Sequence, residues 1–128
     1  MSQISVIGDP GMNELIRLIL ERQRDHVRCT SDGHIGLSAA EQDRPDLIII
    51  HLWTTGLDAF EFYRQAQASP TLRGVPILFY GAMRPERAYP LIQPLGVPGY
   101  LCEPFTREEL VAARDALLRG ETYFPQAA

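Results

Sequence analysis

One apolar segment limits the possible folds of this chain more than any other feature. The aliphatic run Leu47–Ile50 leads directly into His51. A continuous run of this kind is typical of a strand that is buried on both faces, as in the middle of a parallel sheet. Open parallel sheets place their functional residues at the carboxyl ends of such strands. The pattern therefore makes His51 the first candidate for a functional residue.

Short apolar runs and segments of helical spacing alternate five times along the chain. The segments expected to form strands are Ile4–Ile7, His26–Thr30, Leu47–Leu52, Pro76–Tyr80 and Gly99–Cys102. The first segment with helical spacing carries Met12, Leu15, Ile16, Ile19 and Leu20. Five such units in succession predict a doubly wound α/β fold, with helices on both faces of a five-stranded parallel sheet.

Capping and turn residues predict where the other helices begin. The residues Ser31–Gly33 indicate a turn, followed by a short helix over Gly36–Gln42. Two capping boxes are expected, one from Asp58 to Glu61 and one from Thr106 to Glu109. The apolar faces that follow these two boxes are expected to hold Phe60, Tyr63 and Ala66, and then Leu110, Ala113 and Leu117.

Proline residues interrupt the fourth helical segment, which is expected over about Pro85–Leu95. Pro85 suits a first helical turn. Pro90 falls in the interior, where a proline removes a hydrogen bond and costs roughly 3 kcal/mol. This helix is therefore expected to be short, kinked or partly unwound.

Length and charge exclude several classes of protein. A chain of 128 residues corresponds to one domain, expected over residues 1–120 with a tail at 121–128. The net charge of −4 argues against a nucleic-acid surface. We expect neither a signal peptide nor a membrane span, and we expect a cytoplasmic location. Cys29 and Cys102 lack metal-type spacing and are expected to be reduced core thiols.

The ends of four predicted strands carry the candidate site residues. These are Gly8 with Asp9, His51, Gly81, and Glu103 with Pro104. From Ser5 to Arg119 the chain resembles a response-regulator receiver domain. The resemblance rests on the order and spacing of Asp46-Leu47, Gly56-Leu57-Asp58, Val75-Pro76-Ile77, Tyr100, Pro104-Phe105 and Glu108-Glu109-Leu110. It implies a flavodoxin-like sheet with strand order 2-1-3-4-5.

The resemblance also implies a phosphorylation chemistry from which this chain departs at every position. Receivers phosphorylate an aspartate where this chain has His51, and they hold Mg²⁺ with an acidic pair where it has Gly8, flanked by Ile7 and Asp9. A serine or threonine is replaced by Gly81, and a lysine by Glu103. We therefore expect no metal, no cofactor and no enzymatic activity. The chain is interpreted as a phosphorylation-independent protein-binding module in bacterial signal transduction.

Two further expectations concern the same strand ends. The family pattern places an acid at position 51 and a base at 103, whereas this chain has the reverse, so His51 and Glu103 are expected to form a reversed ion pair. The resemblance implies a cis peptide between Glu103 and Pro104. It also aligns Tyr100 with the aromatic switch of the family, and both a retained switch and a fixed packing role stay open.

The same residues leave other classes of function open. His51 can be a structural residue, or the general base of a small α/β enzyme or ligand-binding domain. A dimer module is a third reading. Pro98-Gly99 replaces an acidic pair typical of one receiver dimer face, so a homodimer is expected through the first and fifth helices. The tail at 121–128 resembles the start of a linker to a helix-turn-helix output domain, which this chain does not include.

Overall fold

The computed structural model describes residues 1–126 and confirms the predicted sheet. All neighbouring strands are parallel, and their order is β2-β1-β3-β4-β5. The strands are β1 (Gln3–Ile7), β2 (His26–Thr30), β3 (Leu47–His51), β4 (Ile77–Gly81) and β5 (Gly99–Cys102). The boundaries differ by a residue from the predicted ones at β1, β3 and β4.

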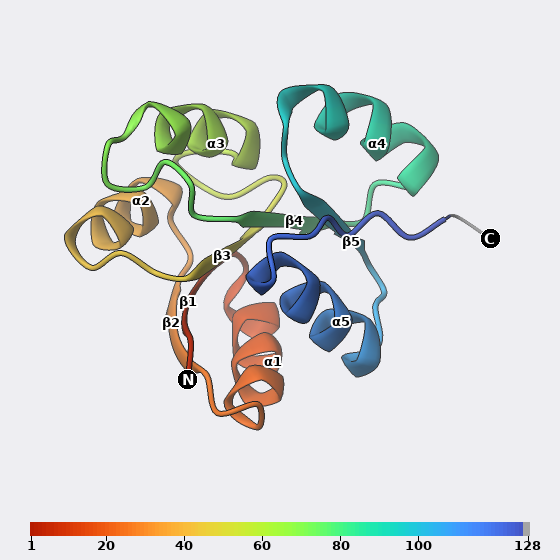
Figure 1. Ribbon diagram of the computed structural model, residues 1–128, viewed down its shortest axis with the longest axis horizontal. Coiled ribbons are helices and arrows are strands. Elements are labelled where there is room, and N and C mark those ends of the chain that lie inside the picture. Colours follow the sequence, from red (N-terminus) through yellow and green to blue (C-terminus); the bar gives the residue numbers. More distant parts are fainter. Residues whose placement is uncertain (127–128) are drawn as a thin grey trace.

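Helices cover both faces of the sheet, with α1 and α5 on one side and α2, α3 and α4 on the other (Figure 1). Their bounds are α1 (Pro10–Glu21), α2 (Gly33–Gln42), α3 (Ala59–Ala68), α4 (Pro85–Ile92) and α5 (Arg107–Leu118). Alternate residues of β3 serve the two layers: Ile48 and Ile50 belong to the α2–α4 side, Leu47 and Ile49 to the α1–α5 side. All four are fully buried. His51 lies two residues after Ile49 and therefore on the same face of the sheet. Its ring contacts that of Tyr80, which belongs to the α1–α5 side.

Side-chain caps fix the starts of several helices. Thr106 and Glu109 form both halves of the predicted capping box. Asp58 accepts from the Glu61 N–H, but the Glu61 carboxylate pairs with Arg64, so only half of the other box forms. The prediction for α2 was too short. The Asp32 carboxylate accepts from the Ile35 N–H and caps this helix, which therefore begins at Gly33.

The predicted buried faces of α1 and α3 were partly wrong. In α3 the buried residues are Ala59, Phe62 and Ala66, whereas Phe60 and Tyr63 lie at the margin of the core. In α1 Leu15 is 46% exposed, and the buried set includes Asn13. Apolar spacing alone does not separate a helix face that meets the sheet from one rotated by one residue.

Helix α4 is short, as its prolines predict. Pro85 occupies the first turn, and the α-helix ends at Ile92, where one turn of 3₁₀-helix, η1 (Gln93–Leu95), takes over. Pro90 lies inside this helix of eight residues.

The expectation of two core thiols was wrong for Cys29. It lies on the edge strand β2, whose outer residues face solvent, and it is exposed; Cys102 is half-buried. Both are free thiols. Within the described residues no helix has the length and apolar character that crossing a membrane requires.

Candidate functional site at the carboxyl ends of the strands

The carboxyl ends of β1, β3, β4 and β5 meet at one edge of the sheet. His51 ends β3 and lies in register with Tyr80, and Gly81 ends β4 in register with Cys102. Glu103 follows β5, and its backbone N–H donates to the Gly81 carbonyl at 2.7 Å. The peptide bond between Glu103 and Pro104 is cis, as the resemblance implied.

His51 contacts Glu103 and has a partner at each ring nitrogen. Nε2 lies 3.5 Å from Glu103 Oε1, and both side chains are 26% exposed. The backbone N–H of Trp53 donates to His51 Nδ1 at 3.2 Å. Nδ1 therefore has a backbone partner, and Nε2 is the ring nitrogen that faces the carboxylate. The two residues of the predicted pair are thus in contact, and the Nε2–Oε1 distance is longer than that of a close ion-paired hydrogen bond.

Asp9 does not join this pair. Its carboxylate caps α1, with Oδ2 accepting from the Met12 N–H at 2.9 Å. Among the residues that the structure describes, no group of three His, Cys, Asp or Glu side chains is placed to hold a metal ion. The lone carboxylate near the family's metal position therefore serves the helix.

Tyr80 fills the space of a side chain at position 8. A Cβ atom added to Gly8 would lie 2.2 Å from the Tyr80 hydroxyl oxygen and 3.3 Å from Asn13 Oδ1. Real Cβ atoms essentially never approach this closely, so no larger residue fits unless Tyr80 moves. Tyr80 is fully buried, and its ring stacks edge-on to His51 with centroids 5.1 Å apart. A large neighbouring side chain thus occupies the space beside Gly8.

Two buried polar atoms near Gly8 have no hydrogen-bond partner among the described residues. Among residues 1–126, neither the Tyr80 hydroxyl nor Asn13 Oδ1 has a hydrogen-bond partner. The Asn13 amide nitrogen, by contrast, donates to the carbonyls of Gly8 and Thr30. Burial, with a smaller contribution from Glu103, raises the pKa of Tyr80. The phenol is therefore held neutral beside Gly8.

Leu52 fills the space at position 81 in the same way. A Cβ atom on Gly81 would lie 2.8 Å from Leu52 Cδ1 and 3.0 Å from its Cγ. Leu52 is fully buried. A serine or threonine at position 81 would therefore have to displace the leucine tip.

Tyr100 is turned inward. Its hydroxyl lies 2.9 Å from the Gly81 carbonyl oxygen and 2.6 Å from that of Met83, to which it donates. The residue is 1% exposed, and burial, with smaller contributions from Cys102 and Glu103, raises its pKa. These contacts tie Tyr100 to the strand end in the inward position.

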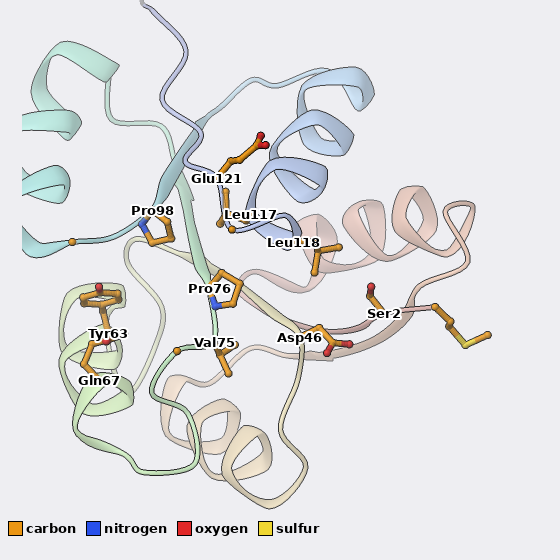
Figure 2. Close-up of a pocket in the computed structure, with 14 residues that line it drawn as sticks. Ser2, Asp46, Tyr63, Gln67, Val75, Pro76, Pro98, Leu117, Leu118 and Glu121 are labelled. Carbon is orange, nitrogen blue, oxygen red and sulfur yellow. The ribbon is translucent and has the colours of Figure 1, made fainter.

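Two hollows lie at opposite ends of the sheet. The strand-end pocket beside His51 has a volume of about 250 Å³ and is lined by Gly8, Asp9, Pro10, Ser31, His51, Trp53, Thr54 and Thr55. A larger hollow of about 710 Å³ opens at the amino ends of the strands and is lined in part by Asp46, Tyr63, Leu117 and Glu121 (Figure 2). Neither lining, as far as the structure describes the chain, includes a lysine or arginine.

Sequence comparison gives relatives that regulate transcription. The DNA-binding dual master transcriptional regulator RpaA of Synechocystis sp. is 32% identical over 131 aligned residues, which cover all of this chain and 54% of RpaA. The DNA-binding response regulator MtrA of Mycolicibacterium smegmatis is 30% identical, covering 89% of this chain and 49% of MtrA. The chain thus spans about half the length of the curated relatives it matches. No family model matches it.

Solved structures share the fold. The chemotaxis response regulator CheY4 of Vibrio cholerae superposes with a TM-score of 0.83 at 22% identity, covering 90% of this chain and 97% of CheY4. The receiver domain of a sensor histidine kinase from Pseudomonas aeruginosa gives 0.78 at 26% identity, covering 93% and 95% of the two chains. Strand order, layers and neighbours define a flavodoxin-like receiver fold. In sequence the chain is similar to about half of each of these response regulators, and in structure it has the fold of receiver domains.

Sequence reasoning missed the residues that pack the site: Tyr80, Leu52, Asn13 and Thr54. The Thr54 hydroxyl donates to the His51 carbonyl at 2.6 Å and so fixes the loop after β3. A signal for two of them was present. Glycines stand at two strand ends, Gly8 and Gly81, and a residue without a side chain leaves space that a neighbour can occupy.

Proposed function

We propose that this chain is a receiver domain that acts without phosphorylation, as a protein-binding module in bacterial signal transduction. The observation that carries the proposal is the contact at Gly8, where an added Cβ would lie 2.2 Å from the Tyr80 hydroxyl. A metal-binding carboxylate at this position requires that space. Leu52 supports the same proposal at Gly81.

Electrostatics supports the proposal independently. A phosphoryl group on a protein carries a charge of about −1.5 to −2 at neutral pH. The group facing position 51 is the Glu103 carboxylate, and the chain contains no lysine at all. Mg²⁺ requires several oxygen ligands in octahedral geometry, whereas the Asp9 carboxylate is engaged as a helix cap. Among the described residues, the lining of this pocket includes no lysine or arginine to neutralise the incoming group.

Incubation with acetyl phosphate and Mg²⁺, followed by intact-protein mass spectrometry, tests the proposal. We expect no gain of a phosphoryl group, and no change in Trp53 fluorescence with fluoroberyllate. Trp53 lines the pocket and is 61% exposed, so it should report occupancy. CheY4 treated in parallel controls for the reagent. A phosphorylated wild-type chain contradicts the proposal.

The alternative of a small enzyme with His51 as general base gains no support from the geometry. A base needs a free lone pair directed at the substrate. His51 Nδ1 accepts from the Trp53 N–H, and Nε2 faces Glu103. Neither nitrogen presents a lone pair to the pocket in this arrangement.

The module's partners belong to the proposal as well. We propose a protein partner, and a homodimer through α1 and α5, because Leu15 and Leu18 on α1 are 46% and 51% exposed. Sedimentation of Leu18→Glu, with Leu91→Glu on α4 as the matched control, tests the dimer. Residues 1–120 would form the receiver, and 121–128 would begin a linker to an output domain. Any DNA binding of the kind named for RpaA and MtrA would then belong to that further domain.

A further inference from the structure

The segment after α5 turns back and lies along the outer edge of β5 (Figure 1). The Tyr123 N–H donates to the Pro98 carbonyl at 2.9 Å, and the Tyr100 N–H donates to the Tyr123 carbonyl at 3.0 Å. Gly99 and Tyr123 form a parallel β-bridge. One residue of the tail therefore extends the sheet at its open edge.

Contacts with Tyr89 of α4 hold the next two residues. The Phe124 ring packs edge-on against Tyr89, with centroids 5.1 Å apart. The Tyr89 hydroxyl donates to the Pro125 carbonyl at 2.5 Å. Phe124 also packs against the core of the α2–α4 side. The tail is thus anchored to both the strand and the helix.

Gly99 makes this close approach possible. A Cβ atom at position 99 would lie 3.0 Å from Leu117 Cδ1 and 3.2 Å from the Tyr123 carbonyl oxygen, closer than ordinary packing allows. Pro98 supplies the carbonyl that accepts from the tail and has no N–H of its own. The dipeptide Pro98-Gly99 is therefore suited to receive an extended segment.

The tail is attached in a way that allows it to detach. Gly120, with φ of +80°, joins it to α5, and no neighbouring atom would contact an added Cβ there. In its described part, Tyr123–Pro125 is held by three hydrogen bonds, one aromatic pair and the packing of Tyr123 and Phe124 at the margin of the two core layers, which are few contacts beside those of the core itself. Segments with few contacts open locally while the rest of a domain stays folded.

We propose that the β5 edge beside α4 is a peptide-binding surface that fits an extended Tyr-Phe-Pro segment parallel to β5. The chain's own Tyr123–Pro125 occupies it, and another chain gains the surface only by displacing this tail. An uncovered edge strand presents free N–H and C=O groups and accepts further strands, so the tail also protects the edge. This inference does not depend on whether the His51 site is phosphorylated.

The test uses the full chain with the double change Tyr123→Pro and Phe124→Ala. The first removes the N–H that Pro98 accepts, and the second removes the ring on Tyr89. Amide hydrogen exchange at Tyr100 should become about tenfold faster, the factor that corresponds to about 1.4 kcal/mol. The Leu101 amide, inside the β4–β5 ladder, reports global stability and should not change. Thr122→Ala, an exposed neighbour, is the control.

A synthetic peptide with the sequence of residues 120–126 provides the second readout, followed through the Tyr100 amide resonance. It should bind the double variant and restore slow exchange, and it should not bind the wild-type chain, whose edge is filled. Unchanged Tyr100 exchange in the variant would overturn the inference. Equal binding to both chains, or binding to neither once the tail is released, would overturn it as well.

Discussion

The carboxyl end of the sheet and the open edge of β5 are both closed, but by different parts of the chain. At the strand end the closing groups are Tyr80 and Leu52, which are fully buried in the core. At the edge the closing group is Tyr123–Pro125, which is attached through Gly120 and held by a few contacts. A core side chain leaves its place only when the core is disrupted, whereas a tail can detach alone. In our account, the site at the strand ends stays filled as long as the domain is folded, whereas the peptide-binding surface at the β5 edge can open.

Replacing Gly8 by alanine should give the largest loss of stability. The added Cβ would lie 2.2 Å from the Tyr80 hydroxyl oxygen, so the free energy of unfolding should fall by about 3 kcal/mol, the upper range for overpacking. Urea denaturation measures it. Adding Tyr80→Phe removes the colliding oxygen and should recover most of the loss. A Gly8→Ala protein as stable as the wild type would show that the strand end is not tightly filled.

Alkaline pH should destabilise the strand end next. Burial raises the pKa of Tyr80 and Tyr100, so folding favours their neutral phenols. Their contribution is complete below the unfolded value of about 10 and is lost as pH rises toward the folded values, by up to about 1.4 kcal/mol per pH unit for each residue. Urea denaturation between about pH 9 and 11 checks this. Tyr80→Phe should reduce the slope, and an unchanged slope counts against a buried neutral phenol.

Substituting Gly81 by serine should cost less, about 1 kcal/mol, because the group it meets is the flexible tip of Leu52. Thermal unfolding checks the loss. Combining it with Leu52→Ala should make the two effects non-additive, since the smaller residue leaves room for the hydroxyl. Simple additivity of the two changes would mean that Leu52 does not fill position 81.

The smallest effect should come from the tail. Tyr89→Phe removes the hydroxyl that donates to Pro125 and keeps the ring that packs on Phe124. Global stability should change by less than about 0.5 kcal/mol, because the lost hydrogen bond holds a segment that opens locally. The change should appear instead as faster exchange of the Tyr100 amide. A global loss as large as that of Gly8→Ala would remove the contrast between the two regions.

Sequence patterns predicted the sheet well because each strand is marked by its own residues. The runs at Leu47–Ile50 and around β4 are apolar on both faces, and proline, glycine and capping residues separate the units. Helix faces were harder: Phe60 and Phe62 differ by two positions, and the burial of Phe62 depends on how α3 meets the sheet. At the site, the sequence showed that positions 8 and 81 are glycines without side chains. It did not identify Tyr80 and Leu52, because filling a space depends on packing across strands.

The most direct measurement compares two restored proteins. The first carries His51→Asp and Glu103→Lys, which return the charges of the family pattern but leave Tyr80 and Gly8 in place. The second adds Gly8→Asp with Tyr80→Val, which clears the metal position and supplies its carboxylate. Each is incubated with acetyl phosphate and Mg²⁺, and the intact mass is recorded. We predict that the first protein gains no phosphoryl group and that the second does. Phosphorylation of the first protein would contradict the claim that packing, and not charge alone, has closed the site.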